Sequence, residues 1–232
     1  NNDKISINVA NNDTIYIDYN ESISLNYILY DNYKKELIKK DVTFLGDSYI
    51  SNHDFQIINK LYFKDNYPEL IWANGLRPTE IKENEDIEYG SGIIGQAGEV
   101  ESIQSNDPEK NIQRTKYNGQ TDWVAVRSKY FLSALILKNP GSYATLSSKN
   151  VLFGQRLHTP SYNVSIGVST NVNNIPLQLY LGPLDIDHIS TTQTNLDETM
   201  NWGWIIIRPI SKGILWVLKF MHNTLHLNYG LV

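Results

Sequence analysis

The chain has 232 residues, a formal net charge of −5 and no cysteine, and 41% of its residues are hydrophobic while 19% are charged. This is the composition of a folded globular protein, which excludes intrinsic disorder and a collagen-like repeat. The lack of cysteine excludes a disulfide framework, a thiolate metal site and a cysteine nucleophile, and the acidic balance excludes a general nucleic-acid binder.

The first 200 residues are dominated by apolar residues that alternate with polar ones, which is the pattern of strands with one buried face. The predicted strands are residues 4–9, 14–19, 22–30, 55–63, 123–126, 131–137, 164–168 and 177–181. Asn, Asp, Gly and Pro separate them, and no helical pattern lies between them. We therefore predict an all-β, mainly antiparallel domain over residues 1–200, packed as a sandwich.

Two polar segments interrupt these strands. Residues 77–86 are rich in acidic side chains and are predicted to form a solvated loop, and residues 102–119 are predicted to form a mobile connection. Gly90, Gly92 and Gly95 match the spacing G-x-G-x-x-G, but a dinucleotide site needs a surrounding βαβ unit, which is missing here. We interpret these glycines as a flexible turn.

Charge and tryptophan are distributed unevenly along the chain. No acidic residue follows Glu198, so residues 201–232 carry a net charge of +3, whereas residues 1–200 carry −8. The same 32 residues contain three of the five tryptophans, which are Trp202, Trp204 and Trp216. An acidic body followed by a basic, Trp-rich segment suggests that the two parts meet different surroundings.

This C-terminal segment has helical periodicity. Pro209 suits the first turn of a helix, so the helix is predicted to begin near Arg208. Its basic residues share one stripe, which only Leu215 interrupts, and apolar residues occupy the opposite side. Such a helix either packs its apolar face on the protein's own sheet or lies in a membrane interface with its cationic stripe toward the headgroups. The absence of acids and the flanking tryptophans favour the membrane, for which the predicted interface residues are Trp202, Trp204, Arg208, Lys212, Trp216, Lys219 and Phe220.

Several blocks between about residue 70 and residue 232 resemble, in the same order, the large periplasmic domain of the YidC family of membrane-protein insertases. Residues 121–135, with Trp123, Tyr130 and Phe131, look like the family's "W-V-A … Y-F … A" strand pair. Residues 179–183, with Gly182 and Pro183, are similar to its "L-x-x-G-P" strand end. Residues 72–80, 200–204 and 210–222 resemble further family segments.

The resemblance implies a β-supersandwich shaped like galactose mutarotases over residues 1–200. Residues 201–232 would then be a basic amphipathic interfacial helix that leads toward a transmembrane segment outside this chain. It also implies a periplasmic location, as part of a multi-pass inner-membrane protein. The implied role is non-catalytic and needs no cofactor: the domain assists membrane-protein insertion and folding by positioning nascent membrane proteins and the SecD–SecF part of the Sec translocon.

The alternative is a carbohydrate-binding or mutarotase-like protein of the cell envelope. Opening a sugar ring needs a carboxylate base and a histidine acid that converge in a cleft. The candidates are His53, His158 and His188 with Glu99 or Glu101, and none of them forms a recognisable motif.

Two further groups have residue types that bind metals. Residues 185–188, Asp-Ile-Asp-His, are predicted to be an exposed turn rather than a metal site. His222 and His226 have a zinc-capable spacing, but they lie on the basic stripe of the helix. We predict no catalytic, cofactor or metal site.

Overall fold

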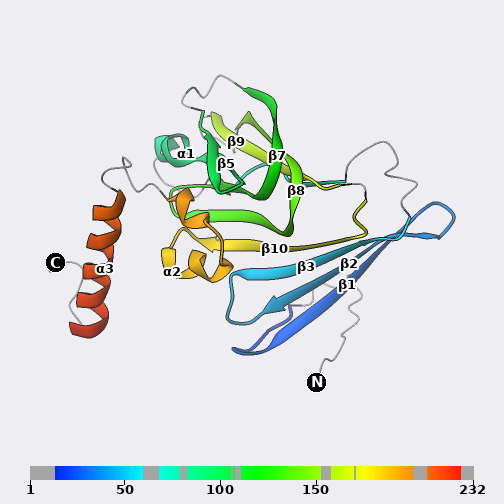
Figure 1. Cartoon of the computed structure of the whole chain (residues 1–232), viewed down its shortest axis with the longest axis horizontal. Coiled ribbons are helices and arrows are strands. Elements are labelled where there is room, and N and C mark those ends of the chain that lie inside the picture. The colour runs from blue at the N-terminus through cyan, green and yellow to red at the C-terminus, as the bar shows by residue number, and fades with distance from the viewer. Residues whose placement is uncertain are drawn as a thin grey trace.

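The computed structural model describes residues 14–59, 68–78, 83–105, 107, 111–152, 158–169, 171–200 and 208–225. In this part of the chain the strands are β1 (Ser22–Tyr30), β2 (Glu36–Leu45), β3 (Ile50–Ile57), β4 (Glu69–Trp72), β5 (Ser91–Gln96), β6 (Glu99–Ile103), β7 (Ile112–Arg127), β8 (Phe131–Leu152), β9 (His158–Gly167) and β10 (Asn174–Pro183). The helices are α1 (Glu83–Tyr89), α2 (Ile186–Ile189) and α3 (Arg208–Leu225), and two 3-10 helices, η2 (Ser190–Thr192) and η3 (Leu196–Thr199), follow α2. Figure 1 shows how they are arranged.

All strand pairs are antiparallel, and the main path through the sheet runs β1-β2-β3-β10-β8-β7-β5-β6, with β9 joining β8 to β4. The central strands β7 and β8 are 16 and 22 residues long. Their register shifts around Thr121, which lies opposite Gly141, while Trp123 lies opposite Ile136. The two long strands bend at this irregularity, so each of them serves both layers of a sandwich (Figure 1).

Alternate residues of the central strands face two different cores, as the strand period of two requires. Val124 and Leu135 join Leu146 and Ile166 in the core between the two layers. Trp123 and Ala134, their chain neighbours, point to the other face, where Ile189 of α2 and Leu196 of η3 cover the sheet. The predicted all-β antiparallel sandwich with a C-terminal helix is confirmed.

The strand predictions are correct where a segment with alternating apolar and polar residues also pairs with a neighbouring strand. β1 spans residues 22–30 as predicted, and the predicted strands at 123–126, 131–137 and 177–181 lie within β7, β8 and β10. The strand predicted at 164–168 overlaps β9, which ends one residue earlier. The strand predicted at 55–63 overlaps the end of β3 at residues 55–57, and residues 60–63 lie outside the described residues. The strand predicted at residues 14–19 is wrong, since residues 14–18 have no regular secondary structure and Tyr16 is 88% exposed. Alternating residues form a strand only where a sheet edge is available to pair with them. The strand predicted at residues 4–9 lies outside the described residues.

The glycine-rich turn predicted at residues 90–95 is also wrong, because residues 91–96 form the buried strand β5. A Cβ on Gly95 would lie 2.3 Å from Cε2 of Trp123, which is fully buried. The glycine therefore lets the indole pack flat against the sheet. Here glycine marks a close approach within a strand and not a turn.

The two polar segments are more ordered than predicted. In the first, residues 83–89 form α1, where the Glu85 carboxylate lies 2.8 Å from Lys129 Nζ. In the second, β6 extends to Ile103 and β7 begins at Ile112. The second stretch has a polar sequence because most side chains of β6 and of the first half of β7 are exposed to solvent, so polarity alone did not distinguish strand from loop.

The segment after β10 begins with a capped helix in place of the predicted exposed turn. The Asp185 side chain accepts a hydrogen bond from the backbone N–H of Asp187, which starts α2. Ile189 at the end of α2 is fully buried. The acidic side chains in this segment therefore cap and surround a short helical layer that closes the second core.

Candidate functional site

Helix α3 lies beside the sandwich, next to the α2 segment (Figure 1). Two of its lysines form ion pairs with the body: Lys212 Nζ lies 2.8 Å from Asp197 Oδ2 in η3, and Lys219 Nζ lies 2.5 Å from Asp187 Oδ1 in α2. Leu215, which interrupts the basic stripe, is partly buried on the same side. The stripe of α3 therefore faces the protein's own acidic helical layer.

Much of the apolar side of α3 is exposed to solvent, although Leu218 and Met221 are partly buried. Its exposed side chains are Ile210, Ile214, Trp216, Val217 and Phe220, with exposed fractions from 45% to 67%. The Trp216 and Phe220 rings are stacked, with centroids 5.9 Å apart and an angle of 16° between the planes. Soluble surfaces rarely expose so many large apolar side chains together unless they mark an interaction site. The interpretation in which this face packs on the protein's own sheet is not what the structure shows.

The structure also places part of the predicted interface set. A helix beginning near Arg208 is confirmed by α3. Trp202 and Trp204, the Arg208 side chain and His226 lie outside the described residues. No helix in the described ranges is long and apolar enough to cross a membrane.

The family-motif residues meet at one end of the sheet. Phe131 at the start of β8 pairs with Pro183 at the end of β10, and Leu132 pairs with Gly182. The Tyr180 hydroxyl donates to the Pro183 carbonyl at 2.6 Å, and burial raises the pKa of Tyr180 to about 12. Trp123 lies deeper, where its Nε1 donates to Asn195 Oδ1 at 2.7 Å. Sequence blocks far apart in the chain therefore make one local structure.

This end of the sheet has an apolar cleft of about 480 Å³, which we call the motif cleft. Its walls include Phe131, Leu181 and Pro183, together with Tyr49, Leu76 and Arg77. Leu76 and Arg77 belong to the block 72–80 that resembles the family, whereas Tyr49 was not singled out. Nothing in the local pattern around residue 49 or residue 76 shows that these residues meet β8 and β10.

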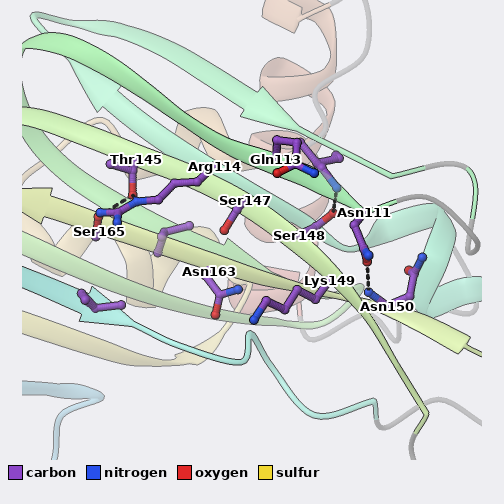
Figure 2. A pocket seen from close by; sticks show the side chains of 13 residues that line it. Asn111, Gln113, Arg114, Thr145, Ser147, Ser148, Lys149, Asn150, Asn163 and Ser165 are labelled. Atoms are coloured by element: carbon purple, nitrogen blue, oxygen red, sulfur yellow. Dashed lines mark hydrogen bonds between the residues drawn. The ribbon is translucent and has the colours of Figure 1, made fainter.

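A second hollow, of about 550 Å³, lies over β7, β8 and β9 and is polar (Figure 2). At one end Arg114 pairs with the Glu69 carboxylate and its Nε donates to Thr145 Oγ1 at 3.2 Å. The hydroxyls of Thr145 and Ser165 are 2.6 Å apart, and Ser165 donates to Glu69 at 2.5 Å. Toward the other end, Asn111 accepts from the backbone N–H of Asn150 at 2.8 Å. These groups can hydrogen-bond a hydroxyl-rich ligand, but the described residues that line the hollow include no aromatic ring on which a sugar could stack.

Among the described residues proposed for sugar-ring opening, His53 and the two glutamates lie on distant strands. His53 is on β3, while Glu99 and Glu101 are on β6, and four strands separate β3 from β6 in the sheet order. His188 lies on α2 and contacts the Tyr49 ring, with centroids 4.8 Å apart. The His158 side chain lies outside the described residues. Within the described ranges, no cluster of three or more His, Asp or Glu side chains is arranged to hold a metal ion.

The shifted pKa of His53 predicts that the stability of the folded chain depends on pH. Its Nε2 lies 2.9 Å from Ser51 Oγ, and burial, aided by the nearby Lys40 charge, lowers the pKa of His53 from 6.5 to about 4. Below pH 6.5 His53 is protonated in the unfolded chain, whereas in the folded chain it stays neutral down to about pH 4. Stability is therefore expected to fall as the pH is lowered through this window. Melting temperatures measured from pH 7 to pH 4 should decline less steeply for His53→Gln, and parallel curves for the two proteins would contradict this account.

Comparison with known proteins gives consistent matches. The family model described as the YidC periplasmic domain matches residues 27–217. The membrane protein insertase YidC of Chlorobium phaeovibrioides is 31% identical over 224 residues, covering 91% of this chain and 37% of the relative. The YidC of Chlorobium limicola is 30% identical over 197 residues, covering 82% of this chain and 33% of the relative. The chain thus spans about a third of the length of these curated relatives. The crystal structure of HI1317 aligns with a TM-score of 0.41 and 11% identity over 69% of this chain and 60% of that one.

Proposed function

The chain belongs to the YidC periplasmic domain family, and from that membership we propose that it is a non-catalytic module of a membrane-protein insertase. The family resemblance of the sequence is confirmed, and the domain is periplasmic. In the proposed role it holds partners beside the inner membrane while the insertion step takes place elsewhere. The proposed partners are the membrane surface, nascent membrane proteins and the SecD–SecF part of the Sec translocon. The insertase names of the relatives support the assignment to membrane-protein insertion.

The observation that carries the proposal is the orientation of α3. Its basic stripe is paired with Asp187 and Asp197 of the body, and its apolar face is turned outward. A helix with one apolar and one polar face binds in the plane of a bilayer interface by burying the apolar face among the headgroups and upper acyl chains. The two ion pairs then fix the orientation of the sandwich relative to the membrane surface.

This orientation implies different proposed roles for the body and for the C-terminal segment. Residues 1–200 form the periplasmic sandwich, and residues 201–232 form the interfacial segment. Within that segment Trp216 and Phe220 enter the interface, joined by Trp202, Trp204 and Arg208 from the start of the segment. Lys212 and Lys219 instead connect the helix to the body. Trp123, Tyr130, Phe131, Gly182 and Pro183 are structural residues of the sandwich.

Truncation tests whether the segment docks the domain. A chain that ends at Thr199 retains the buried residues of both cores. Among the described contacts it loses Met200 at the edge of the second core and the two ion pairs with α3, each of which is worth about 0–1 kcal/mol. It is therefore expected to fold, but to bind vesicles containing phosphatidylglycerol much more weakly than the full chain. Co-sedimentation with vesicles measures the difference, and circular dichroism establishes that the shortened chain is folded. Equal binding of a folded short chain and the full chain would overturn the proposed docking role.

A further inference from the structure

The motif cleft is a second apolar surface, built by the sandwich and not by α3. Its side chains are unusually open to solvent, since Tyr49, Phe131 and Leu181 are each 45–47% exposed, and the neighbouring Tyr130 is 52% exposed. A volume of about 480 Å³ is in the range of sites for small ligands, which is roughly 300–1,000 Å³. The cleft therefore has the size and the apolar walls of a binding site.

The polar side chains at the edge of the motif cleft indicate which class of ligand it binds. Arg77 lines the cleft and is exposed, and Tyr49 presents a ring with a polar hydroxyl group. An arginine guanidinium binds a phosphate through paired hydrogen bonds, and tyrosine is suited to positions where an apolar region meets a polar one. Lys129, which precedes the exposed Tyr130, is paired with Glu85 at 2.8 Å. Among the described residues that line the cleft, Arg77 is the only cation, and an apolar cleft with a cation at its rim is complementary to an anionic amphiphile.

The position of the cleft connects it with α3. The Tyr49 wall contacts His188 of α2, and Asp187, the preceding residue, pairs with Lys219 of α3. The Leu184 N–H donates to the Tyr130 carbonyl at 2.7 Å, which ties the chain leading into α2 to the start of β8. The short helix α2 thus touches both the cleft and the helix proposed to lie on the membrane.

We propose that the motif cleft binds one anionic phospholipid, with an acyl chain against Phe131 and Leu181 and the phosphate beside Arg77. The inference rests on the proposed function, because a domain docked through α3 has its cleft next to a lipid surface. The lipid gives the sandwich its own contact with the membrane, so two separate sites fix its position. An apolar peptide segment would also fill the walls, but it would leave Arg77 without a matching negative charge.

Monomeric short-chain lipids test this site apart from vesicle docking. The full chain is titrated with dihexanoylphosphatidylglycerol and, separately, with dihexanoylphosphatidylcholine, both below the concentration at which they form micelles. Calorimetry is expected to show saturable binding of one lipid per chain, about fivefold tighter for the glycerol lipid because its phosphate charge is not compensated. Arg77→Gln should weaken binding of the glycerol lipid more than binding of the choline lipid, and so remove this preference.

Matched leucine substitutions identify the site. Leu181→Ser, in the cleft wall, is expected to weaken lipid binding by about tenfold, whereas Leu29→Ser, at the similarly exposed Leu29 of β1, should leave it unchanged. Phe131→Ser replaces Leu181→Ser if the latter does not fold. Equal affinities for the two serine variants, or no saturable lipid binding, would overturn the proposal. Saturable binding of a soluble leucine-rich decapeptide in place of lipid would also overturn it, in favour of a peptide site.

The outcome is separable from the test of α3 docking. Substitutions on the apolar face of α3 should reduce vesicle binding without changing the affinity for monomeric lipid. Conversely, a chain that binds vesicles but no monomeric lipid would retain the proposed function and lose the cleft proposal.

Discussion

Replacing Trp123 by alanine is expected to lower the free energy of unfolding by about 3–5 kcal/mol, the cost of removing a large aromatic side chain from a packed core. Trp123 is fully buried, and its indole N–H donates to Asn195 at 2.7 Å, which joins β7 to the segment between η2 and η3. Truncation leaves a cavity beside Gly95 and removes the indole N–H that Asn195 accepts. Urea denaturation measures the change, and the melting temperature should fall by about 10 °C for a chain of this length.

Trp216→Ala is the matched control for this prediction. Trp216 is 67% exposed on α3, so its removal should alter the free energy of unfolding by less than about 0.5 kcal/mol. Trp123→Phe should fall between the two, because the phenyl ring fills part of the space but offers no hydrogen bond. A Trp123→Ala protein as stable as Trp216→Ala would contradict the placement of Trp123 in the second core.

The second large effect concerns which face of α3 meets the membrane. Changing Ile214, Trp216 and Phe220 together to serine removes apolar surface worth roughly 1 kcal/mol for each half-exposed side chain. Vesicle affinity should then fall by about 100-fold. As a control, Ile28, Leu29 and Tyr30 of the edge strand β1, which are also 40–56% exposed, are changed together to serine. This change should leave vesicle affinity unchanged.

Changing Lys212 and Lys219 to glutamine decides between the two orientations of the helix. If both lysines faced the headgroups, each would contribute about 1 kcal/mol at an anionic surface, and the pair would cost about 30-fold in affinity. Because the structure pairs them with Asp197 and Asp187, we expect a loss of less than about threefold. A larger loss from the lysine pair than from the apolar triple would show that the basic stripe, and not the apolar face, contacts the membrane.

Much of the architecture could be predicted from the sequence. The alternation in residues 22–30 and the helical period after residue 208 each report burial within a single element, so the bounds of β1 and the start of α3 were predicted correctly. The strands β2, β5 and β6 were missed for a shared reason. Their residues are polar on the exposed face, or, as at Gly95, small because another strand's Trp123 occupies the space.

The candidate site was only partly predictable. The sequence identified Phe131, Gly182 and Pro183 by family resemblance but did not indicate that they line a cleft with Tyr49 and Arg77. Contacts between β8, β10 and the segments before β3 and after β4 depend on sheet order, which local patterns do not encode. For the candidates His53, Glu99 and Glu101 the residue types suggested a catalytic site, but the order of the strands in the sheet places these residues far apart.

By itself the sequence determined the all-β body, the amphipathic helix, the charge contrast between them and the family, because each of these is a property of residue order within one segment. Only the tertiary structure decided which way the helix faces. The basic stripe is attractive both to anionic headgroups and to carboxylates, and the choice depends on where Asp187 and Asp197 lie in space. The folded body brings these carboxylates within 2.5–2.8 Å of the lysines and leaves the apolar face free.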